Sequence, residues 1–236
     1  MKIAIVGAGP GVGLAVARRF GREGFDVALT ARDAGHLAAL TGELARDGVV
    51  ASAHPADLTD PASLTTALDR VGPVDVLVYN GAGVAGSRTS ALDVTRESAQ
   101  DAFDGAVLGA VTAVRAVLPG MLERGSGTLL FTSGISAVHP IDFLGNIGIA
   151  VAGLRNYVLA LAQAVSSRGV HVGHVPIGAA IAPGSPAAPE AVAETHWRLH
   201  TDRDRNEVIL GDLATVQAAI NGLNTAPASP PPAQSR

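Results

Sequence analysis

A glycine-rich segment directly after the first apolar run carries the clearest chemical signal in the chain. Residues 2–6 read KIAIV, and GAGPGVG fills residues 7–13 before a helical pattern begins. A turn without Cβ atoms lets backbone N–H groups approach a pyrophosphate, which lies at the positive end of the following helix dipole. The spacing G-x-x-x-G-x-G differs from the more common G-x-G-x-x-G, so a purely structural turn is the alternative. The residues expected to bind a dinucleotide are Gly7, Gly9, Pro10, Gly11, Val12 and Gly13.

The end of the second apolar run bears on which dinucleotide binds. Thr30, Ala31, Arg32 and Asp33 follow the run FDVAL. An acidic side chain at this strand end binds ribose hydroxyls in NAD sites, whereas a nearby arginine accommodates the 2′-phosphate of NADP. Because Ala31 stands in place of the acid and Arg32 follows it, the sequence favours NADP, with NAD still possible. A solvated Arg32 paired with Asp33 is the competing interpretation.

Short apolar runs alternate with segments of helical period along most of the chain. Besides residues 2–6, such runs occur at 25–31, 49–55, 74–80, 127–133 and 170–177. Uniformly apolar strands separated by helices indicate a parallel sheet covered on both faces, and right-handed crossovers make it doubly wound. We predict a Rossmann-like α/β fold with three α/β/α layers and a single domain over residues 1–224. The Pro-rich residues 225–236 are expected to form a disordered tail.

The composition excludes several classes of protein. Of 236 residues, 47% are hydrophobic and 16% are charged, which rules out a disordered chain or a coiled coil. A net charge of −4 and an aromatic content of 3% leave no broad footprint for nucleic acid. Charged and polar residues interrupt the longest low-charge region, around residues 141–165, and the absence of cysteine fits a reducing cytosol. We therefore expect a cytoplasmic protein with a small-molecule substrate and with no nucleic-acid or membrane partner.

Three motifs together resemble the short-chain dehydrogenase/reductase family over roughly Lys2 to Gly178. They are the glycine turn, the Asp57-Leu58 pair after the third strand, and DVLVYNGAG at residues 75–83, in which Tyr79 replaces one asparagine of the family pattern. The resemblance implies an oxidoreductase whose aspartate binds the adenine amino group and whose asparagine-glycine segment supports the cofactor. The further cofactor residues that it implies are Asp57, Leu58, Asn80, Gly81, Ala82 and Gly178.

The catalytic half of the family pattern is missing from this chain. The family uses a tyrosine, a lysine four residues later, an earlier serine and an asparagine on the preceding helix. The corresponding positions hold Ile147, Val151, Gly134 and Ala106, and Lys2 is the only lysine. The chain thus resembles a divergent branch without the Tyr/Lys pair. Hydride delivery to carbon still requires a proton donor for oxygen, so another group must supply it.

Three polar residues near the vacant positions are candidates for that role. Ser133, close to Ser136, lies at the carboxyl end of the fifth strand, where open α/β sheets bind their ligands. His139 follows in the same loop, and histidine is able to donate a proton near neutral pH. Asn146 adjoins the vacant tyrosine position and could hydrogen-bond a carbonyl. Each has a structural alternative, because serine and asparagine cap turns and helices and His139 precedes Pro140.

Two further features concern metals and partners. His196 and His200 stand four residues apart beside Trp197, but no third ligand follows at a recognisable spacing, so we expect no metal site. The helices around 100–122 and 141–167 are apolar on more than one face. In the resembling family these helices form the subunit interface, so a homodimer or homotetramer is expected.

Three functions remain open at this stage. The first is an NADP-preferring oxidoreductase that acts on a small carbonyl or alcohol with a non-standard proton donor, and the cofactor motifs favour it. The second is a catalytically silent sensor or scaffold that binds the cofactor. The third is a non-redox isomerase, cyclase or dehydratase on the same fold.

Overall fold

The computed structural model describes residues 1–81 and 88–216, and in this part the strands form one parallel sheet. The strand order is β3-β2-β1-β4-β5-β6-β7. The strands are β1 (Lys2–Val6), β2 (Asp26–Thr30), β3 (Ala51–Ala53), β4 (Val76–Tyr79), β5 (Gly127–Gly134), β6 (Val170–Gly178) and β7 (Leu210–Gly211). The order reverses between β1 and β4, which is where a doubly wound sheet opens a crevice for a ligand.

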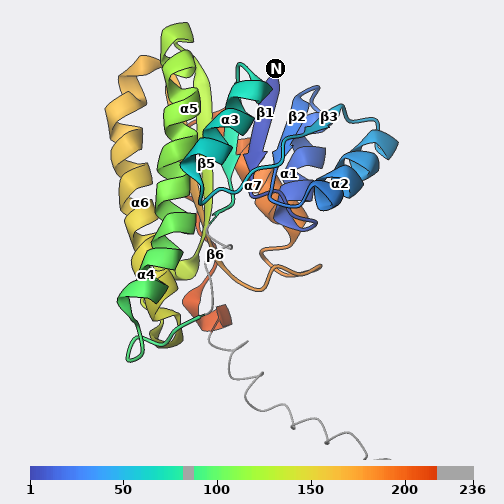
Figure 1. Ribbon diagram of the computed structural model, residues 1–236. Helices are drawn as coiled ribbons and strands as arrows, with labels where there is room; N and C mark the ends of the chain where they lie inside the picture. Colours follow the sequence, from blue (N-terminus) through green and yellow to red (C-terminus); the bar gives the residue numbers. More distant parts are fainter. Residues whose placement is uncertain (82–87, 217–236) are drawn as a thin grey trace, which may run out of the picture.

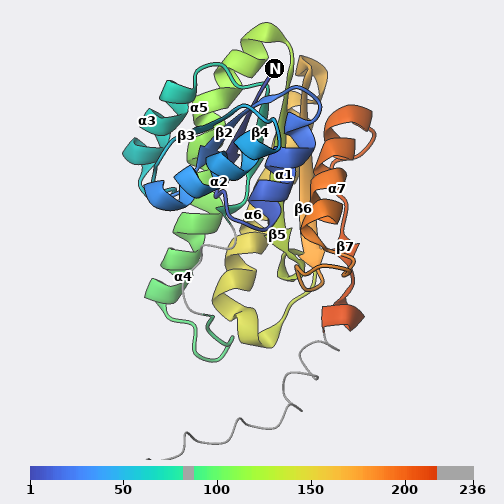
Figure 2. The same cartoon turned by 90° about the vertical axis from the view of Figure 1, so that its right-hand side faces the viewer.

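Helices cover both faces of the sheet (Figures 1 and 2). One face carries α3 (Pro61–Val71), α4 (Arg96–Phe103), α5 (Gly109–Arg124) and α6 (Gly145–Val165), with a π-helical segment, Asp104–Leu108, joining α4 to α5. The other face carries α1 (Val12–Gly21), α2 (Ala34–Arg46) and α7 (Pro189–Asp202). The predicted three-layer Rossmann-like fold in a single domain is therefore confirmed.

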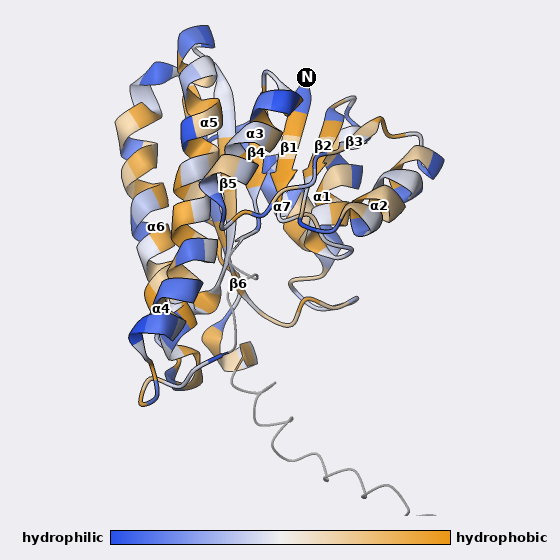
Figure 3. Ribbon diagram, in the orientation of Figure 1, coloured by the Kyte–Doolittle hydropathy of each residue, from blue (hydrophilic) through white to orange (hydrophobic). Residues whose placement is uncertain are grey.

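The strands have the burial that a doubly covered sheet requires. All residues of β4 and β6 are buried, and Figure 3 shows β1 as mostly hydrophobic after Lys2. The third strand is shorter than the predicted run of 49–55, because β3 lies at the sheet edge and Ser52 and Ala53 are exposed. The predicted boundary at residue 224 and the tail of 225–236 lie outside the described residues.

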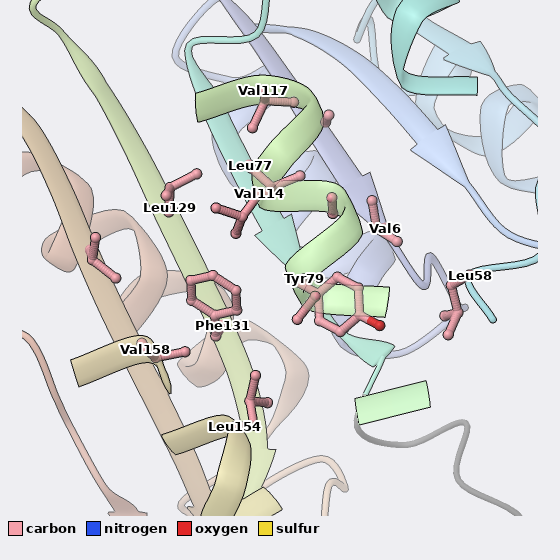
Figure 4. Close-up of a cluster of buried hydrophobic side chains, with 14 of the residues drawn as sticks. Val6, Leu58, Leu77, Tyr79, Val114, Val117, Leu129, Phe131, Leu154 and Val158 are labelled. Carbon is pink, nitrogen blue, oxygen red and sulfur yellow. The ribbon is translucent and has the colours of Figure 1, made fainter. Parts of the chain in front are cut away.

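Two apolar clusters hold the layers together. Figure 4 shows the cluster between the sheet and α5 and α6, in which Tyr79 of β4 and Phe131 of β5 have ring centroids 6.4 Å apart. The buried Tyr79 hydroxyl donates to the backbone oxygen of Gly105 in the π-helical segment. Burial raises the pKa of Tyr79, so this hydroxyl is a fixed donor in the core rather than an acid of the site.

Two helical stretches are long and apolar enough to cross a membrane by length and composition. They are Arg96–Arg124 and Asp142–Arg168. Both include helices that pack on the sheet in Figure 1, and core helices of globular domains commonly have this composition. The absence of a membrane partner stays a prediction.

Candidate functional site

Two cavities at the carboxyl ends of the strands meet at the glycine turn. The smaller, of about 310 Å³, lies beside the ends of β1 and β2 and the segment after β3. The larger, of about 630 Å³, extends from the turn past the end of β5 to the start of α6. Gly7 and Gly9 line both cavities. The turn therefore separates two chambers, as expected for a site that holds the two halves of a dinucleotide.

The glycines of the turn have two different reasons to lack a side chain. Gly7 has φ +78°, and a Cβ at Gly13 would lie 3.0 Å from Cα of Ala8. These two glycines are required by the backbone itself. A Cβ at Gly9 or Gly11, by contrast, would meet nothing within 4 Å. The structural interpretation of the turn therefore applies to Gly7 and Gly13, while binding at Gly9 and Gly11 stays a prediction.

The smaller cavity has features that suit the ribose and adenine end of a dinucleotide. The buried Oγ1 of Thr30 has no hydrogen-bond partner in the part of the chain that the structure describes. Arg32 lines the cavity, while the carboxylate of Asp33 accepts a hydrogen bond from the His36 backbone N at 2.9 Å and caps α2. The carboxylate of Asp57 accepts from the backbone N and Oγ1 of Thr59, which lowers the pKa of Asp57.

The larger cavity is lined by buried polar atoms that lack partners. Within the described residues, neither Nδ2 of Asn80 nor Oγ of Ser136 has a hydrogen-bond partner. The Thr132 hydroxyl lies 2.6 Å from Oδ1 of Asn80 and donates to it, so the amide orientation is fixed. A Cβ at Gly134 would lie 3.7 Å from Oγ of Ser136. The Ser136 hydroxyl therefore stands next to the vacant serine position of the family pattern.

Only part of the predicted cofactor set lines the two cavities. The lining members are Gly7, Gly9, Gly11, Val12, Gly13, Arg32, Leu58 and Asn80. The members placed outside the lining are Pro10, Asp57, Gly81 and Gly178, and Ala82 lies outside the described residues. Thr30 and Ala8 were not predicted, although both stand at strand or turn positions that the glycine motif already marks.

The structure brings one of the three candidate proton donors to the cavity. Ser133 lines it, whereas His139 is exposed and does not belong to the lining. Asn146 is buried, but its Oδ1 accepts from the Thr89 backbone N at 3.0 Å and its Nδ2 donates to the Ser98 backbone O at 3.3 Å. Asn146 thus ties the start of α6 to two other segments; it does not cap the helix, as the structural alternative had it, because it lies within α6.

The vacant tyrosine and lysine positions are apolar in the structure as well. Ile147 contributes to the cavity wall, and Val151 and Ala106 are buried in the core. Neither a buried valine nor a buried alanine is able to exchange a proton, so these two positions supply no proton donor.

His196 and His200 serve the fold separately, each through a hydroxyl of β5. His196 Nε2 lies 2.8 Å from Oγ1 of Thr132, and His200 Nδ1 lies 2.9 Å from Oγ1 of Thr128. Burial lowers the pKa of His196 to about 3 and that of His200 to about 4. Within the described residues, no group of three or more possible ligands forms a metal site.

Acid should destabilise the fold through His196. Its pKa is about 3 in the folded protein and about 6.5 in an unfolded chain, so the unfolded state binds one more proton between these values. Stability is complete above pH 6.5 and falls by about 1.4 kcal/mol per pH unit below it, or about 2 kcal/mol between pH 7 and pH 5. Urea unfolding at the two pH values should show this loss reduced by about 2 kcal/mol in His196→Gln. Equal losses in the variant and the wild type would contradict the assignment.

Comparisons with known proteins agree with the fold and the turn. A family model described as short chain dehydrogenase matches residues 1–219. The 2-(S)-hydroxypropyl-CoM dehydrogenase 3 of Xanthobacter autotrophicus is 31% identical over 236 residues, covering 93% of this chain and 92% of that protein. The 1-deoxy-11-beta-hydroxypentalenate dehydrogenase of Streptomyces arenae is 35% identical over 167 residues, which span 68% of this chain and 57% of that protein.

A solved structure matches with similar coverage. It is an L-sorbose reductase from Gluconobacter frateurii in complex with NADPH and L-sorbose, with a TM-score of 0.79 and 25% identity, covering 90% of this chain and 96% of that one. Since one family pattern extends over residues 1–219 and a relative of nearly equal length is 31% identical, the chain belongs to the short-chain dehydrogenase family of NAD(P)-dependent oxidoreductases.

Proposed function

We propose that this protein is an NADP-preferring oxidoreductase that acts on a small carbonyl or alcohol without the tyrosine and lysine of its family. The observation that carries the proposal is the larger cavity, which is lined jointly by the glycine turn and by the end of β5. A cofactor held at Gly9 and Gly11 would share this chamber with a substrate. Ser133 and Ser136 line the same chamber.

The residues present fit a nicotinamide dinucleotide. Gly9 and Gly11 leave open space above the turn, and Thr30 Oγ1 and Asn80 Nδ2 are buried polar atoms that a ligand would satisfy. When bound, the nicotinamide would exchange a hydride with the substrate carbon. The protein's own task is to orient the two molecules, exclude water and hold the proton that leaves or joins the substrate oxygen.

The walls of the larger cavity favour a substrate with an apolar body. Beyond Ser133 and Ser136 they are formed mostly by aliphatic and aromatic side chains, which include Ile135, Ile141, Phe143, Leu144, Ile147 and Ile181. Relatives act on diverse small molecules by name, among them 2-(S)-hydroxypropyl-CoM and L-sorbose. A small ketone or secondary alcohol with an apolar substituent is therefore the proposed substrate class.

The choice of NADP rests on Arg32. Its side chain lines the smaller cavity, and the neighbouring carboxylate of Asp33 is engaged by the N-terminus of α2. Arg32→Ala should raise the Kd for NADPH by about 10-fold or more and change the Kd for NADH less than about 3-fold, because only the 2′-phosphate loses a charge-assisted contact. Nicotinamide fluorescence titrations measure both constants, with Arg22→Ala, an exposed arginine after α1, as the matched control. Equal losses for the two cofactors would overturn the NADP preference.

We also propose that the protein is a cytoplasmic homodimer or homotetramer that associates through α5 and α6. Leu108, which precedes α5, and Ile149 of α6 are 45% and 54% exposed, as apolar side chains at a subunit interface would be in an isolated chain. Sedimentation equilibrium tests this, since Ile149→Glu should shift the protein toward the monomer. A wild-type protein that is monomeric at micromolar concentration would overturn the proposal.

A further inference from the structure

A chain of four hydrogen-bonded side chains leads away from the larger cavity toward α6. Ser133 Oγ lies 2.8 Å from His174 Nε2, and His174 Nδ1 lies 3.0 Å from Glu207 Oε2. Arg155 of α6 donates to both oxygens of Glu207, from Nε at 2.7 Å and from Nη2 at 2.8 Å. Ser133, His174 and Glu207 come from β5, β6 and the segment before β7, and Ser133 alone of the four lines the cavity.

The backbone holds Glu207 next to β6. The His174 backbone N donates to the Asn206 backbone O at 2.9 Å, and the Val208 backbone N donates to the His174 backbone O at 3.0 Å. The two bonds place Glu207 opposite His174 as a parallel bridge. The carboxylate is therefore held in place by the sheet as well as by Arg155.

The partners determine where the protons lie. Bonding to Arg155 lowers the pKa of Glu207, so its carboxylate is ionised and only accepts hydrogen bonds. His174 Nδ1 must then carry a hydrogen. Burial lowers the pKa of His174, so the ring is neutral and Nε2 is an acceptor. The Ser133 hydroxyl donates to Nε2, since its alternative acceptor, the Gly134 backbone O, is farther away at 3.3 Å.

The second hydroxyl and histidine pair at the cavity has the opposite polarity. The Thr132 hydroxyl donates to Asn80 Oδ1, so His196 Nε2 must donate to Thr132. His196 Nδ1 is buried and, within the described residues, has no partner. This histidine therefore has no acceptor site facing Thr132 and no carboxylate behind it. Of the two pairs, Ser133 and His174 have the arrangement that moves a proton.

On the basis of the proposed function, we propose that Ser133 exchanges the proton with the substrate oxygen, and that His174 and Glu207 form a relay behind it that replaces the family's missing tyrosine and lysine. Ser133 is the catalytic residue in this arrangement. His174 and Glu207 are positioning residues that act through it.

The proton balance can be written for alcohol oxidation. The substrate O–H bond breaks as its proton joins Ser133 Oγ, while the Ser133 proton moves to His174 Nε2. The hydrogen of the substrate C–H bond leaves with its electron pair as a hydride, for which an oxidised nicotinamide dinucleotide would be the acceptor, and the carbonyl forms. His174 gains one positive charge, which the Glu207 carboxylate stabilises. In carbonyl reduction each transfer is reversed, and protonated His174 supplies the proton.

The pH dependence follows from the groups around His174. Glu207 faces it from the segment before β7, Arg155 lies behind Glu207 on α6, and His196 of α7 lies near enough for its own pKa to be lowered by His174. Neutral His174 is the form that accepts the proton. The rate of alcohol oxidation should therefore fall as acid protonates His174, which gives the pH–rate profile an acid limb. A group with a purely structural role would produce no acid limb.

Three variants of the full-length protein test the relay. Ser133→Ala and His174→Gln should each lower kcat by about 100-fold or more, the range of a lost acid or base, with the Kd for NADPH unchanged within about 3-fold. Both should lose the acid limb of the pH profile. His171→Gln is the control, because His171 is a buried histidine of the same strand outside the chain of bonds. The kcat, the Kd for NADPH and the pH profile of His171→Gln should match those of the wild type.

The protonation state of His174 provides a readout that needs no turnover. In ¹⁵N-labelled protein without cofactor, the imidazole of His174 should carry its hydrogen on Nδ1 at pH 7, assigned by its loss in His174→Gln. A hydrogen on Nε2 overturns the relay, whatever the activity of the enzyme. A kcat of His174→Gln within about 3-fold of the wild-type value also overturns it. A wild type that binds NADPH yet turns over no small ketone or alcohol overturns the proposed function instead, and the relay with it.

Discussion

Gly9→Val should abolish cofactor binding while leaving the fold intact. A Cβ at Gly9 would meet no atom within 4 Å, so a side chain at this position begins in open space. Gly9 lines both cavities, however, and the added methyl groups would stand where the turn must approach a pyrophosphate. We expect the Kd for NADPH to rise by about 100-fold or more, or about 2.7 kcal/mol of binding free energy.

The free energy of unfolding of Gly9→Val should stay within about 0.5 kcal/mol of the wild type. Gly42→Val is the matched control, because Gly42 is exposed in α2 and a Cβ there also meets nothing within 4 Å. The free energy of unfolding and the Kd for NADPH of Gly42→Val should both stay close to the wild-type values. Cofactor binding that survives in Gly9→Val would mean that the turn is structural and that the dinucleotide, if any, lies elsewhere.

The fold was predictable because strands that are buried on both faces have a simple, continuously apolar sequence pattern. The strands Val76–Tyr79 and Val170–Gly178 are buried along their whole length, so their sequences lack the alternation of a half-exposed strand. Glycines mark the turn for a similar reason, since Gly7 at φ +78° tolerates few other residues. The doubly wound arrangement then follows from the crossover rule rather than from any single residue.

The proton-transfer residues were not predictable to the same degree. Residues near the vacant tyrosine were chosen by proximity in sequence, yet Asn146 is engaged by Thr89 and Ser98, and His139 faces solvent. Glu207 lies 33 residues from His174 in an irregular segment, and no local pattern pairs the two. One usable signal was present, because a histidine inside an otherwise apolar strand such as VHVGHVPI must find a partner or stay neutral.

Phe131→Ala should cause the largest loss of stability among single substitutions near the site. Phe131 is fully buried on β5, two residues before Ser133, and packs near Tyr79 and the side chains of α6 (Figure 4). Removing its ring leaves a cavity that this layer cannot fill, at a cost of about 3–5 kcal/mol. The melting temperature should fall by about 10 °C for a chain of this size, as scanning calorimetry would measure. Leu92→Ala, at a 96% exposed leucine, should shift it little.

Phe131→Ala also distinguishes the stability that comes from core packing from the stability that comes from cofactor binding. Phe131 faces the α6 layer, whereas Gly9 and Gly11 do not depend on its ring for their conformation. A cofactor that binds only the folded state stabilises it by mass action, by about 2.7 kcal/mol at a concentration 100 times its Kd. NADPH should therefore restore much of the stability that Phe131→Ala loses, and it should leave the stability of Gly9→Val unchanged. If NADPH failed to stabilise Phe131→Ala, the end of β5 and the glycine turn would form one cooperative unit, and the two substitutions would converge on the same defect.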